Sequence, residues 1–245
     1  MTSRIRLKAS AGLLLMLAVL VLAGLALTGQ VTRDDLGVDQ RLSVLRFSSA
    51  TTASMDLTLA AQEVVGLAVL GLAVVVLVLR HRRWDAVRLF VMAGTAWLVA
   101  LVVKYLFNRP RPPARLWLQP PDPTGSFPSG HTTTAVVVLL IVCVLVWRLR
   151  RLRWVVMVVG LSYVLAVGAS RLYLGDHYPT DIIGSFLTVA ASVLLVSAVT
   201  DLPQVRQLGA RLLRVPGIAD SSVPVGHVEV SARQETAPRP SGYSA

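Results

Sequence analysis

Six long stretches without a charged residue constrain the fold of this chain more than any other feature of its sequence. Each one, extended slightly at its ends, approaches the roughly 20 residues that a helix needs to cross the hydrocarbon core of a bilayer. The stretches lie between Lys8 and Arg33, Glu63 and Arg80, Arg88 and Lys104, His131 and Arg148, Arg153 and Arg171, and Asp181 and Asp201. We therefore expect an all-α, polytopic bundle of six transmembrane helices, with spans near residues 10–28, 57–79, 86–106, 131–147, 154–171 and 180–200.

The composition agrees with a membrane protein. Of the 245 residues, 54% are hydrophobic and only 15% are charged, which departs from the averages of soluble domains. A soluble bundle of buried helices is the alternative, but six such uncharged runs make it a poor one. The formal net charge of +11 would favour a nucleic-acid partner if the basic residues shared one soluble face. They lie instead at the ends of the predicted spans, so we expect no nucleic-acid partner.

The basic residues also predict the orientation of the chain. They precede the first span, separate the second span from the third and the fourth from the fifth, and follow the sixth. These residues are Arg4, Arg6, Lys8, Arg80, Arg82, Arg83, Arg88, Arg148, Arg150, Arg151, Arg153, Arg206, Arg211 and Arg214. The positive-inside rule then places both termini in the cytoplasm and the loops 29–56, 107–130 and 172–179 outside a cell membrane. Within the first loop, residues 36–56 mix apolar and polar positions in a way that favours a short surface helix.

The chain divides into three parts. Residues 1–200 form the predicted membrane domain. Its first span has a basic start, as a cleaved signal peptide has, but 24 uncharged residues are long for that role and favour a retained helix. Residues 201–215 have the pattern of a basic amphipathic helix on the cytoplasmic face of the membrane. Residues 216–245 are rich in Gly, Ser and Pro, and we expect them to be disordered.

Ionisable residues gather at the outer ends of four predicted spans. Each has a simple interpretation by itself: Lys104 can extend its amine to the membrane surface, Ser129 and Gly130 can cap a helix, and Asp181 suits a first helical turn. These separate roles do not explain why all of the residues lie on one side. The group comprises Lys104, Arg109, Arg111, His131, Arg171, His177 and Asp181. Charged groups at this depth are usually functional.

Together these residues suit phosphoryl transfer. Lys104, Arg111 and Arg171 can neutralise phosphate oxygens, and arginine does so with two parallel hydrogen bonds. Ser129 and the free amides at the start of the fourth span suit an anion, because the N-terminus of a helix carries unpaired N–H groups. Of two histidines, one can act as the nucleophile and the other as a general acid. An aspartate four residues after a histidine can orient its imidazole.

Three motifs resemble those of the type 2 phosphatidic acid phosphatase superfamily, which also includes vanadium haloperoxidases. The first is Lys104, six intervening residues, and then Arg111 and Pro112. The second is the run Pro128, Ser129, Gly130 and His131. The third is Ser170 and Arg171, five residues, His177, three residues, and Asp181. All eleven specified positions match in order, and the six predicted spans extend the resemblance over about residues 1–200.

The resemblance implies a metal-independent phosphatase that needs no cofactor and works through a phosphohistidine. It implies that His177 attacks phosphorus while Asp181 orients it, and that His131 protonates the leaving group. It also implies that the phosphate is held by Lys104, Arg111, Ser129, Gly130 and Arg171.

The resemblance leaves several functions open. The leading expectation is a phosphatase for lipid phosphates or diphosphates, with undecaprenyl diphosphate favoured over phosphatidic acid or phosphatidylglycerol phosphate. A lipid transporter or flippase is the non-enzyme alternative, although inverted repeats and broken helices, which are typical of transporters, are not evident in the sequence. A haloperoxidase is a third possibility, which the membrane spans disfavour. We expect membrane lipids as partners and no obligate protein partner.

Overall fold

The computed structural model of the chain describes residues 2–213, which fold into helices joined by loops and contain no strand. The predicted all-α class is therefore confirmed for these residues, whereas the predicted disordered tail 216–245 lies outside them. In chain order the elements are α1 (Ser3–Leu25), α2 (Gly29–Ser43), α3 (Ser48–Ala60), α4 (Glu63–Leu79), α5 (Arg83–Phe107), the short 3-10 helix η1 (Ala114–Leu116), α6 (Gly130–Val146), α7 (Arg150–Tyr173), α8 (Pro179–Thr200) and α9 (Pro203–Leu213).

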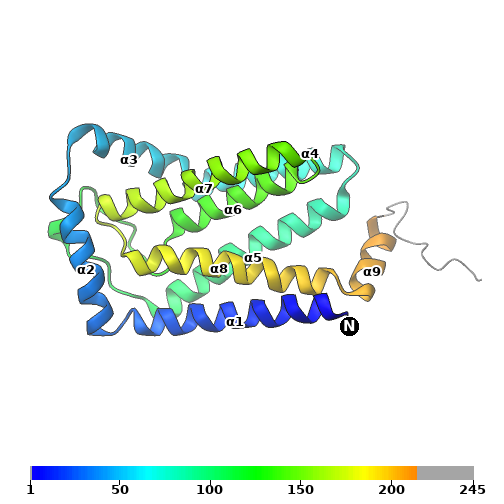
Figure 1. Cartoon of the computed structure of the whole chain (residues 1–245), viewed down its shortest axis with the longest axis horizontal. Helices are drawn as coiled ribbons and strands as arrows, with labels where there is room; N and C mark the ends of the chain where they lie inside the picture. The colour runs from blue at the N-terminus through cyan, green and yellow to red at the C-terminus, as the bar shows by residue number, and fades with distance from the viewer. Residues whose placement is uncertain (1, 214–245) are drawn as a thin grey trace, which may run out of the picture.

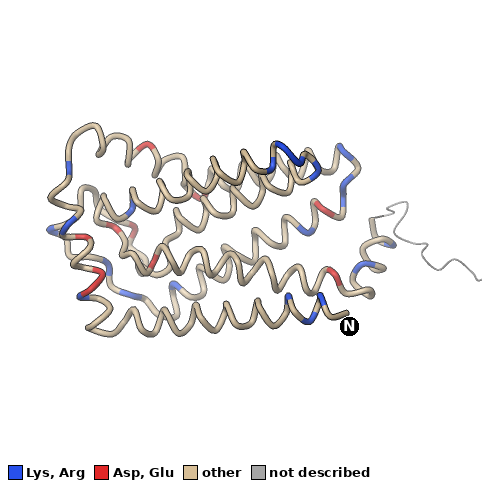
Figure 2. The backbone as a smooth tube through the Cα atoms, in the orientation of Figure 1, with Lys and Arg blue, Asp and Glu red and all other residues tan. Residues whose placement is uncertain are grey.

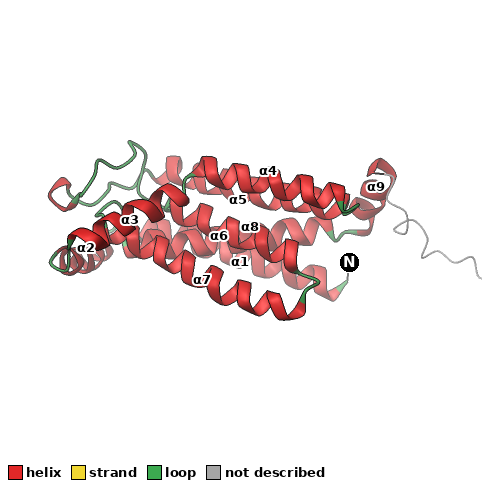
Figure 3. Ribbon diagram, turned by 90° about the horizontal axis from the view of Figure 1, so that it is seen from above, coloured by secondary structure: helices red, strands yellow, loops and turns green. Residues whose placement is uncertain are grey.

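The long helices lie side by side in one elongated bundle (Figures 1 and 3). Helix α2 crosses one end of the bundle, which we call the α2 end, and the short α9 lies at the other, the α9 end. Helix α6 packs against α4, α5, α7 and α8, so it occupies the centre, whereas α1 packs mainly along α8. The α2 end contains the long loop 108–129, which joins α5 to α6, and the short loop 174–178, which joins α7 to α8.

The lengths and compositions of the helices suit a membrane. Helices α1, α5, α7 and α8 are each long and apolar enough to cross one, and α3 with α4 forms a fifth candidate that is bent by 47°. Helix α6 is apolar but has only 17 residues. Of the described helices, four or five thus qualify as spans, and the predicted count of six holds only approximately. The outward faces carry large apolar side chains such as Leu13, Leu17 and Phe90, as contact with lipid requires.

Two predicted boundaries differ from the structure. The second span was predicted as one helix over 57–79, but the helix stops at Ala60 and a new one begins at Glu63. Gln62 adopts an extended backbone, and the Glu63 carboxylate then lies in the first turn of α4, where the helix dipole favours a negative charge. The short surface helix predicted within 36–56 is replaced by α2 and α3, which meet in the turn before Ser48.

The predicted basic helix over 201–215 corresponds to α9 within the described residues. Its buried side is made of Gly209 and Ala210, and an added Cβ at Gly209 would lie 2.3 Å from Trp84 of α5. Its leucines, Leu208 and Leu212, point outward and are exposed. This arrangement leaves an apolar edge beside the arginines of the helix, as expected of a helix at a membrane surface.

Charge is divided unequally between the two ends (Figure 2). The α9 end carries thirteen Lys and Arg against two acidic residues, in residues 2–10, 80–88, 147–153 and 200–213. The α2 end carries eight basic and eight acidic residues, in residues 26–63, 104–131 and 171–181. The excess of positive charge in the described chain therefore lies entirely at the α9 end.

Close packing between α8 and the loop before α6 fixes the geometry of the α2 end. A methyl group added at Gly184 would lie 2.4 Å from ring atoms of Phe127, and that ring is completely buried. We expect Gly184→Ala to destabilise the protein by about 1–3 kcal/mol, since a buried ring cannot move without displacing its neighbours. Gly71→Ala on α4 is the control, because its added methyl meets nothing within 4 Å. Thermal unfolding in detergent, followed by tryptophan fluorescence, would contradict this packing if both variants melted alike.

Candidate active site

Five of the eight predicted site residues line one cavity at the α2 end. The cavity has a volume of about 540 Å³ and lies where the C-terminus of α5, the N-termini of α4 and α6 and the loop before α8 meet. The predicted residues that line it are Lys104, Arg111, Gly130, His131 and His177. Glu63, Asp122 and Thr124 also line it. The segments between 104 and 177 thus converge as the motifs predict.

The geometry of His177 suits a nucleophile. Its Nδ1 lies 3.3 Å from Oδ2 of Asp181, and its Nε2 lies 3.3 Å from Nη1 of Arg111. A proton on Nδ1 donated to the carboxylate leaves the Nε2 lone pair directed at the cavity. Burial lowers the pKa of His177 well below its usual value, and the hydrogen bond to Asp181 only partly offsets this. The imidazole is therefore neutral at physiological pH, as an attacking nitrogen must be.

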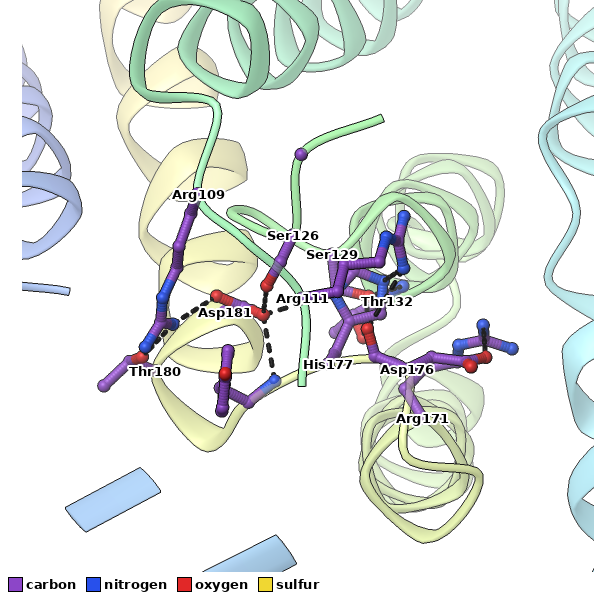
Figure 4. Close-up of polar contacts among 12 residues, drawn as sticks. Arg109, Arg111, Ser126, Ser129, Thr132, Arg171, Asp176, His177, Thr180 and Asp181 are labelled. Atoms are coloured by element: carbon purple, nitrogen blue, oxygen red, sulfur yellow. Dashed lines mark hydrogen bonds and ion pairs between the residues drawn. The ribbon is translucent and has the colours of Figure 1, made fainter. Parts of the chain in front are cut away.

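The start of α8 holds Asp181 in place. Pro179 occupies the first turn, where its fixed φ suits a helix, and the Tyr178 backbone N–H donates to Asp181 Oδ2 at 2.9 Å. The hydroxyl of Ser126 also donates to Oδ2, and Arg109 Nη1 donates to Oδ1 at 2.6 Å (Figure 4). Asp181 is completely buried, so these donors replace the water that an ionised carboxylate would otherwise bind.

Loop carbonyls orient two cations of the cavity. Lys104 donates from Nζ to the carbonyl of Gly125 at 2.8 Å. Arg111 donates from Nε to the carbonyl of Thr124 and from Nη1 to the carbonyl of Asp176, both at 3.0 Å. Neutral carbonyls accept these bonds without cancelling the positive charges, so both cations stay available to an anion.

Arg171 lies apart from this cavity. Its Nη2 forms an ion pair with the buried Asp176, and its Nη1 donates to Thr58 Oγ1 at 2.7 Å. Arg171 lines a neighbouring cavity of about 370 Å³, which shares His131 and Asp122 with the first. His131 is half-buried and opens onto both cavities. The predicted arginine thus lines a different cavity from Lys104 and Arg111, and His131 lines both.

Ser129 does not line either cavity. Its side chain is completely buried and accepts hydrogen bonds from the Thr132 amide at 3.4 Å and from the Thr132 hydroxyl at 3.1 Å. These contacts make it the N-cap of α6. The neighbouring Gly130 does face the cavity, and an added Cβ there would lie 3.3 Å from a carboxylate oxygen of Glu63.

Several residues at the site were not among the eight predicted to catalyse the reaction or to bind phosphate, although the sequence placed Arg109 in the ionisable group at the outer ends of the spans. Arg109 belongs to the basic run before α6, and Asp176 directly precedes His177, but spacing alone gives neither a partner. Ser126 and Asp35 carry no sequence signal at all, because they reach the site through tertiary packing. Within residues 2–213, no group of three or more His, Cys, Asp or Glu residues is arranged to hold a metal ion.

Comparison with known proteins shows which family this chain resembles. The sequence profile described as the PAP2 superfamily matches residues 85–203. A crystal structure of a transmembrane PAP2-type phosphatidylglycerolphosphate phosphatase from Bacillus subtilis superimposes with a TM-score of 0.69 and 25% sequence identity. That match covers 78% of this chain and 96% of the other. The chain is thus similar to the PAP2 superfamily in sequence over residues 85–203 and to a PAP2-type phosphatase in fold over most of its length. The resemblance inferred from the three motifs is confirmed, and the chain is a multi-pass membrane protein.

Two relatives from Bacillus subtilis match a little under half of the chain. The undecaprenyl-diphosphatase BcrC of Bacillus subtilis is 31% identical over 117 residues, which are 45% of this chain and 57% of that protein. Phosphatidylglycerophosphatase B of the same organism is 32% identical over 111 residues, which are 43% of this chain and 53% of that protein. The chain thus spans about half the length of these relatives. Their names give two different lipids as substrates, so similarity to the PAP2 superfamily does not by itself select a substrate.

Asp39 on α2 provides a prediction about pH. It is 1% exposed, and neither of its carboxylate oxygens has a hydrogen-bond partner among the described residues. Burial, with smaller contributions from Asp35 and Asp181, raises the pKa of Asp39 from 3.8 to about 8. The folded protein therefore keeps a proton that the unfolded chain releases above pH 4, so this residue costs stability increasingly as the pH rises from about 4 to 8.

We expect Asp39→Asn to raise the melting temperature at pH 8 and to leave it unchanged near pH 4, because asparagine resembles the protonated acid. Asp34→Asn on the same helix, where the carboxylate is exposed, is the control and should give no such trend. Melting curves of both variants over this pH range provide the measurement. A variant that melted lower than the parent at pH 8 would mean that Asp39 is ionised in the folded protein.

Proposed function

We propose that this chain is an integral-membrane phosphatase that hydrolyses lipid phosphate monoesters or diphosphates through a phosphohistidine at His177. One observation carries the proposal. The Nε2 atom of His177 faces Arg111 in a cavity that also contains Lys104 and His131, while Asp181 holds the opposite ring nitrogen. A candidate nucleophile, two cations that can bind phosphate and a second histidine thus line one cavity.

In the proposed first step, the terminal phosphate lies between Lys104 and Arg111. His177 Nε2 forms a bond to phosphorus as the bond from phosphorus to the leaving oxygen breaks. His131, protonated when the anionic phosphate binds beside it, gives its proton to that oxygen, which is the alkoxide of a monoester or the phosphate of a diphosphate. The Asp181 carboxylate stabilises the positive charge that the His177 ring acquires. Lys104 and Arg111 stabilise the negative charge that develops on the phosphate oxygens, so the step requires no metal.

In the second step, water attacks the phosphohistidine. His131, now neutral, takes a proton from that water as it forms its bond to phosphorus, and the bond from phosphorus to Nε2 breaks. Inorganic phosphate leaves, and His177 and His131 return to their starting protonation states. The half-buried position of His131, open to both cavities, supports its exchange of protons with leaving groups and water.

The shape of the site supports a lipid substrate. A side pocket of about 160 Å³ extends the phosphate cavity between α4, α5 and α6, and Trp97, Leu98 and Leu101 form its apolar wall. It shares Glu63, Lys104 and Gly130 with the main cavity. A lipid can therefore leave its chain against apolar side chains in the membrane while its phosphate reaches the cations. We favour undecaprenyl diphosphate, because one relative is an undecaprenyl-diphosphatase by name. Phosphatidic acid and phosphatidylglycerol phosphate are the alternatives, because the other relative is a phosphatidylglycerophosphatase by name.

Phosphate release by the purified protein from these three lipids in detergent tests the function, and trapping of acid-labile phosphoenzyme tests the roles. We expect His177→Ala to form no phosphoenzyme. His131→Ala should lose about 10²–10⁴-fold in rate with a lipid monoester, the usual contribution of a general acid. With p-nitrophenyl phosphate the loss should be much smaller, because p-nitrophenolate leaves without a proton.

His81→Asn is the matched control, since this histidine is exposed at the α9 end and its left-handed backbone suits asparagine. It should retain parental activity. Phosphoenzyme in His177→Ala would mean that His177 is not the nucleophile. Equal losses of rate for both leaving groups in His131→Ala would mean that His131 is not the general acid. A protein that releases phosphate from none of the lipids would point to transport in place of hydrolysis.

The proposed enzyme works at the outer face of the membrane. The positive charge of the α9 end supports a cytoplasmic location for that end and for both termini, by the positive-inside rule. In a Cys143→Ala background, we expect Ala114→Cys to react with an impermeant thiol reagent in intact cells and Arg151→Cys to react only after lysis. Both positions are exposed in the structure, so a difference reports the side of the membrane. The opposite pattern would place the active site in the cytoplasm.

A further inference from the structure

Arg109 lies between two buried carboxylates at the base of the site. Its Nη1 donates to Asp181 Oδ1 at 2.6 Å, and its Nη2 donates to Asp35 Oδ2 at 2.8 Å. The three residues are 2%, 0% and 5% exposed, for Arg109, Asp181 and Asp35 respectively. Buried ion pairs of this length interact strongly, because little water screens them.

Further contacts fix this arrangement. Thr180 accepts a hydrogen bond from Arg109 Nη1 at 2.7 Å and donates one to Asp35 Oδ2 at 2.5 Å. The guanidinium also lies over the ring of Tyr178, with its central carbon 4.1 Å from the ring centroid. Asp35 comes from α2, the helix that crosses the end of the bundle, and it is 146 residues before Asp181 in the chain (Figure 1). The crossing helix is thus joined by ion pairs to the aspartate that orients the nucleophile.

The balance of charge gives Asp35 a role. An arginine paired with Asp181 alone would cancel the negative charge that must stabilise the His177 ring when it attacks phosphorus. Because Asp35 neutralises the other side of Arg109, the three groups together keep one net negative charge next to His177. Asp39, also buried on α2, holds its proton at neutral pH and adds no charge to this balance. Arg46 bonds to carbonyls of Tyr173 and Leu116, and is not among the hydrogen-bond partners of these carboxylates.

We propose that Asp35 and Arg109 are positioning residues for the reaction, which hold the Asp181 carboxylate and keep its charge available to His177. Helix α2 is thereby a part of the active site and not only a cover. The inference rests on the proposed function, since it assigns these residues to the same phosphoryl-transfer step. It also makes a prediction about hydrogen bonding that can be measured without turnover.

The first test compares Asp35→Asn with Asp34→Asn. The first substitution removes one charge while it keeps the size and a polar group near Arg109. We expect kcat to fall about 10–100-fold with KM changed little, by analogy with metalloenzymes that lose a residue hydrogen-bonded to a metal ligand. Asp34 is the preceding residue on the same helix. Its exposed carboxylate accepts hydrogen bonds from Gln30 and from no other described residue, so Asp34→Asn should keep the parental kcat.

A double variant distinguishes an effect of Asp35 on the charge around Asp181 from an effect on packing. Asp35→Asn combined with Arg109→Gln removes one negative and one positive charge and restores the original net charge around Asp181. We expect the double variant to recover at least severalfold in kcat over Asp35→Asn alone. If these residues only supported the fold, the second substitution would add its own loss, and the double variant would be the poorer enzyme.

The hydrogen bond between His177 and Asp181 gives a readout that does not depend on activity. The chain has four histidines, so the Hδ1 resonance of His177 can be assigned in ¹⁵N-histidine-labelled protein by its disappearance in His177→Asn. We expect this resonance to move upfield in Asp35→Asn, as Asp181 becomes a weaker acceptor, and to return in the double variant. The same movement in a protein that releases no phosphate would support the charge balance and refute the proposed function. Unchanged kcat and unchanged resonance in Asp35→Asn would overturn the inference while the phosphatase stands.

Discussion

The burial of the Asp181 carboxylate is the interaction on which the rest of the site depends. An ionised carboxylate without water costs several kcal/mol unless donors replace the water. Here the donors come from different parts of the chain: Arg109 and Ser126 from the loop before α6, and His177 with the Tyr178 amide from the loop before α8. Satisfying this one charge therefore brings both loops together at the end of α8. The position of the His177 ring follows from the requirement that Asp181 be fully hydrogen-bonded.

The membrane adds a second constraint, which acts on the backbone. Helix ends inside an apolar medium must find partners for their free amides and carbonyls. At the start of α6 the Ser129 side chain accepts from Thr132, and the Ser129 carbonyl accepts from Thr133 and from Ser185 of α8. Because α6 is short and begins among these partners, its N-terminus is recessed at the centre of the bundle. The break before Glu63 likewise places the N-terminus of α4 inside the bundle. The cavity lies between the N-termini of α4 and α6.

Much of the arrangement of the candidate site could be predicted from the sequence, because the motifs bring several of its residues together locally. The spacing of His177 and Asp181 is four residues, which brings the two side chains together across the first turn of α8 without any knowledge of the fold. The convergence of Lys104 and His131 followed from their positions at the ends of apolar runs on one predicted side. The break at residues 61–62 could not be predicted, because apolar residues continue on both sides of it. The role of Asp35 could not be predicted either, because its contact with Arg109 joins residues 74 apart and depends on how α2 crosses α8.

The two histidines differ in how the protein constrains them, and this difference matches the demands of their proposed roles. The ring of His177 is 1% exposed and held on both nitrogens, so a single orientation of its Nε2 lone pair is favoured. A nucleophile gains from such fixation, because attack on phosphorus requires alignment with the bond that breaks. His131 is half-buried between two cavities. A general acid that serves an alkoxide, a phosphate and later a water molecule must reach oxygens in different places, and a fixed ring would serve only one of them. Rigidity at one histidine and access at the other thus follow from the same arrangement: a buried aspartate beside the first and open space on both sides of the second.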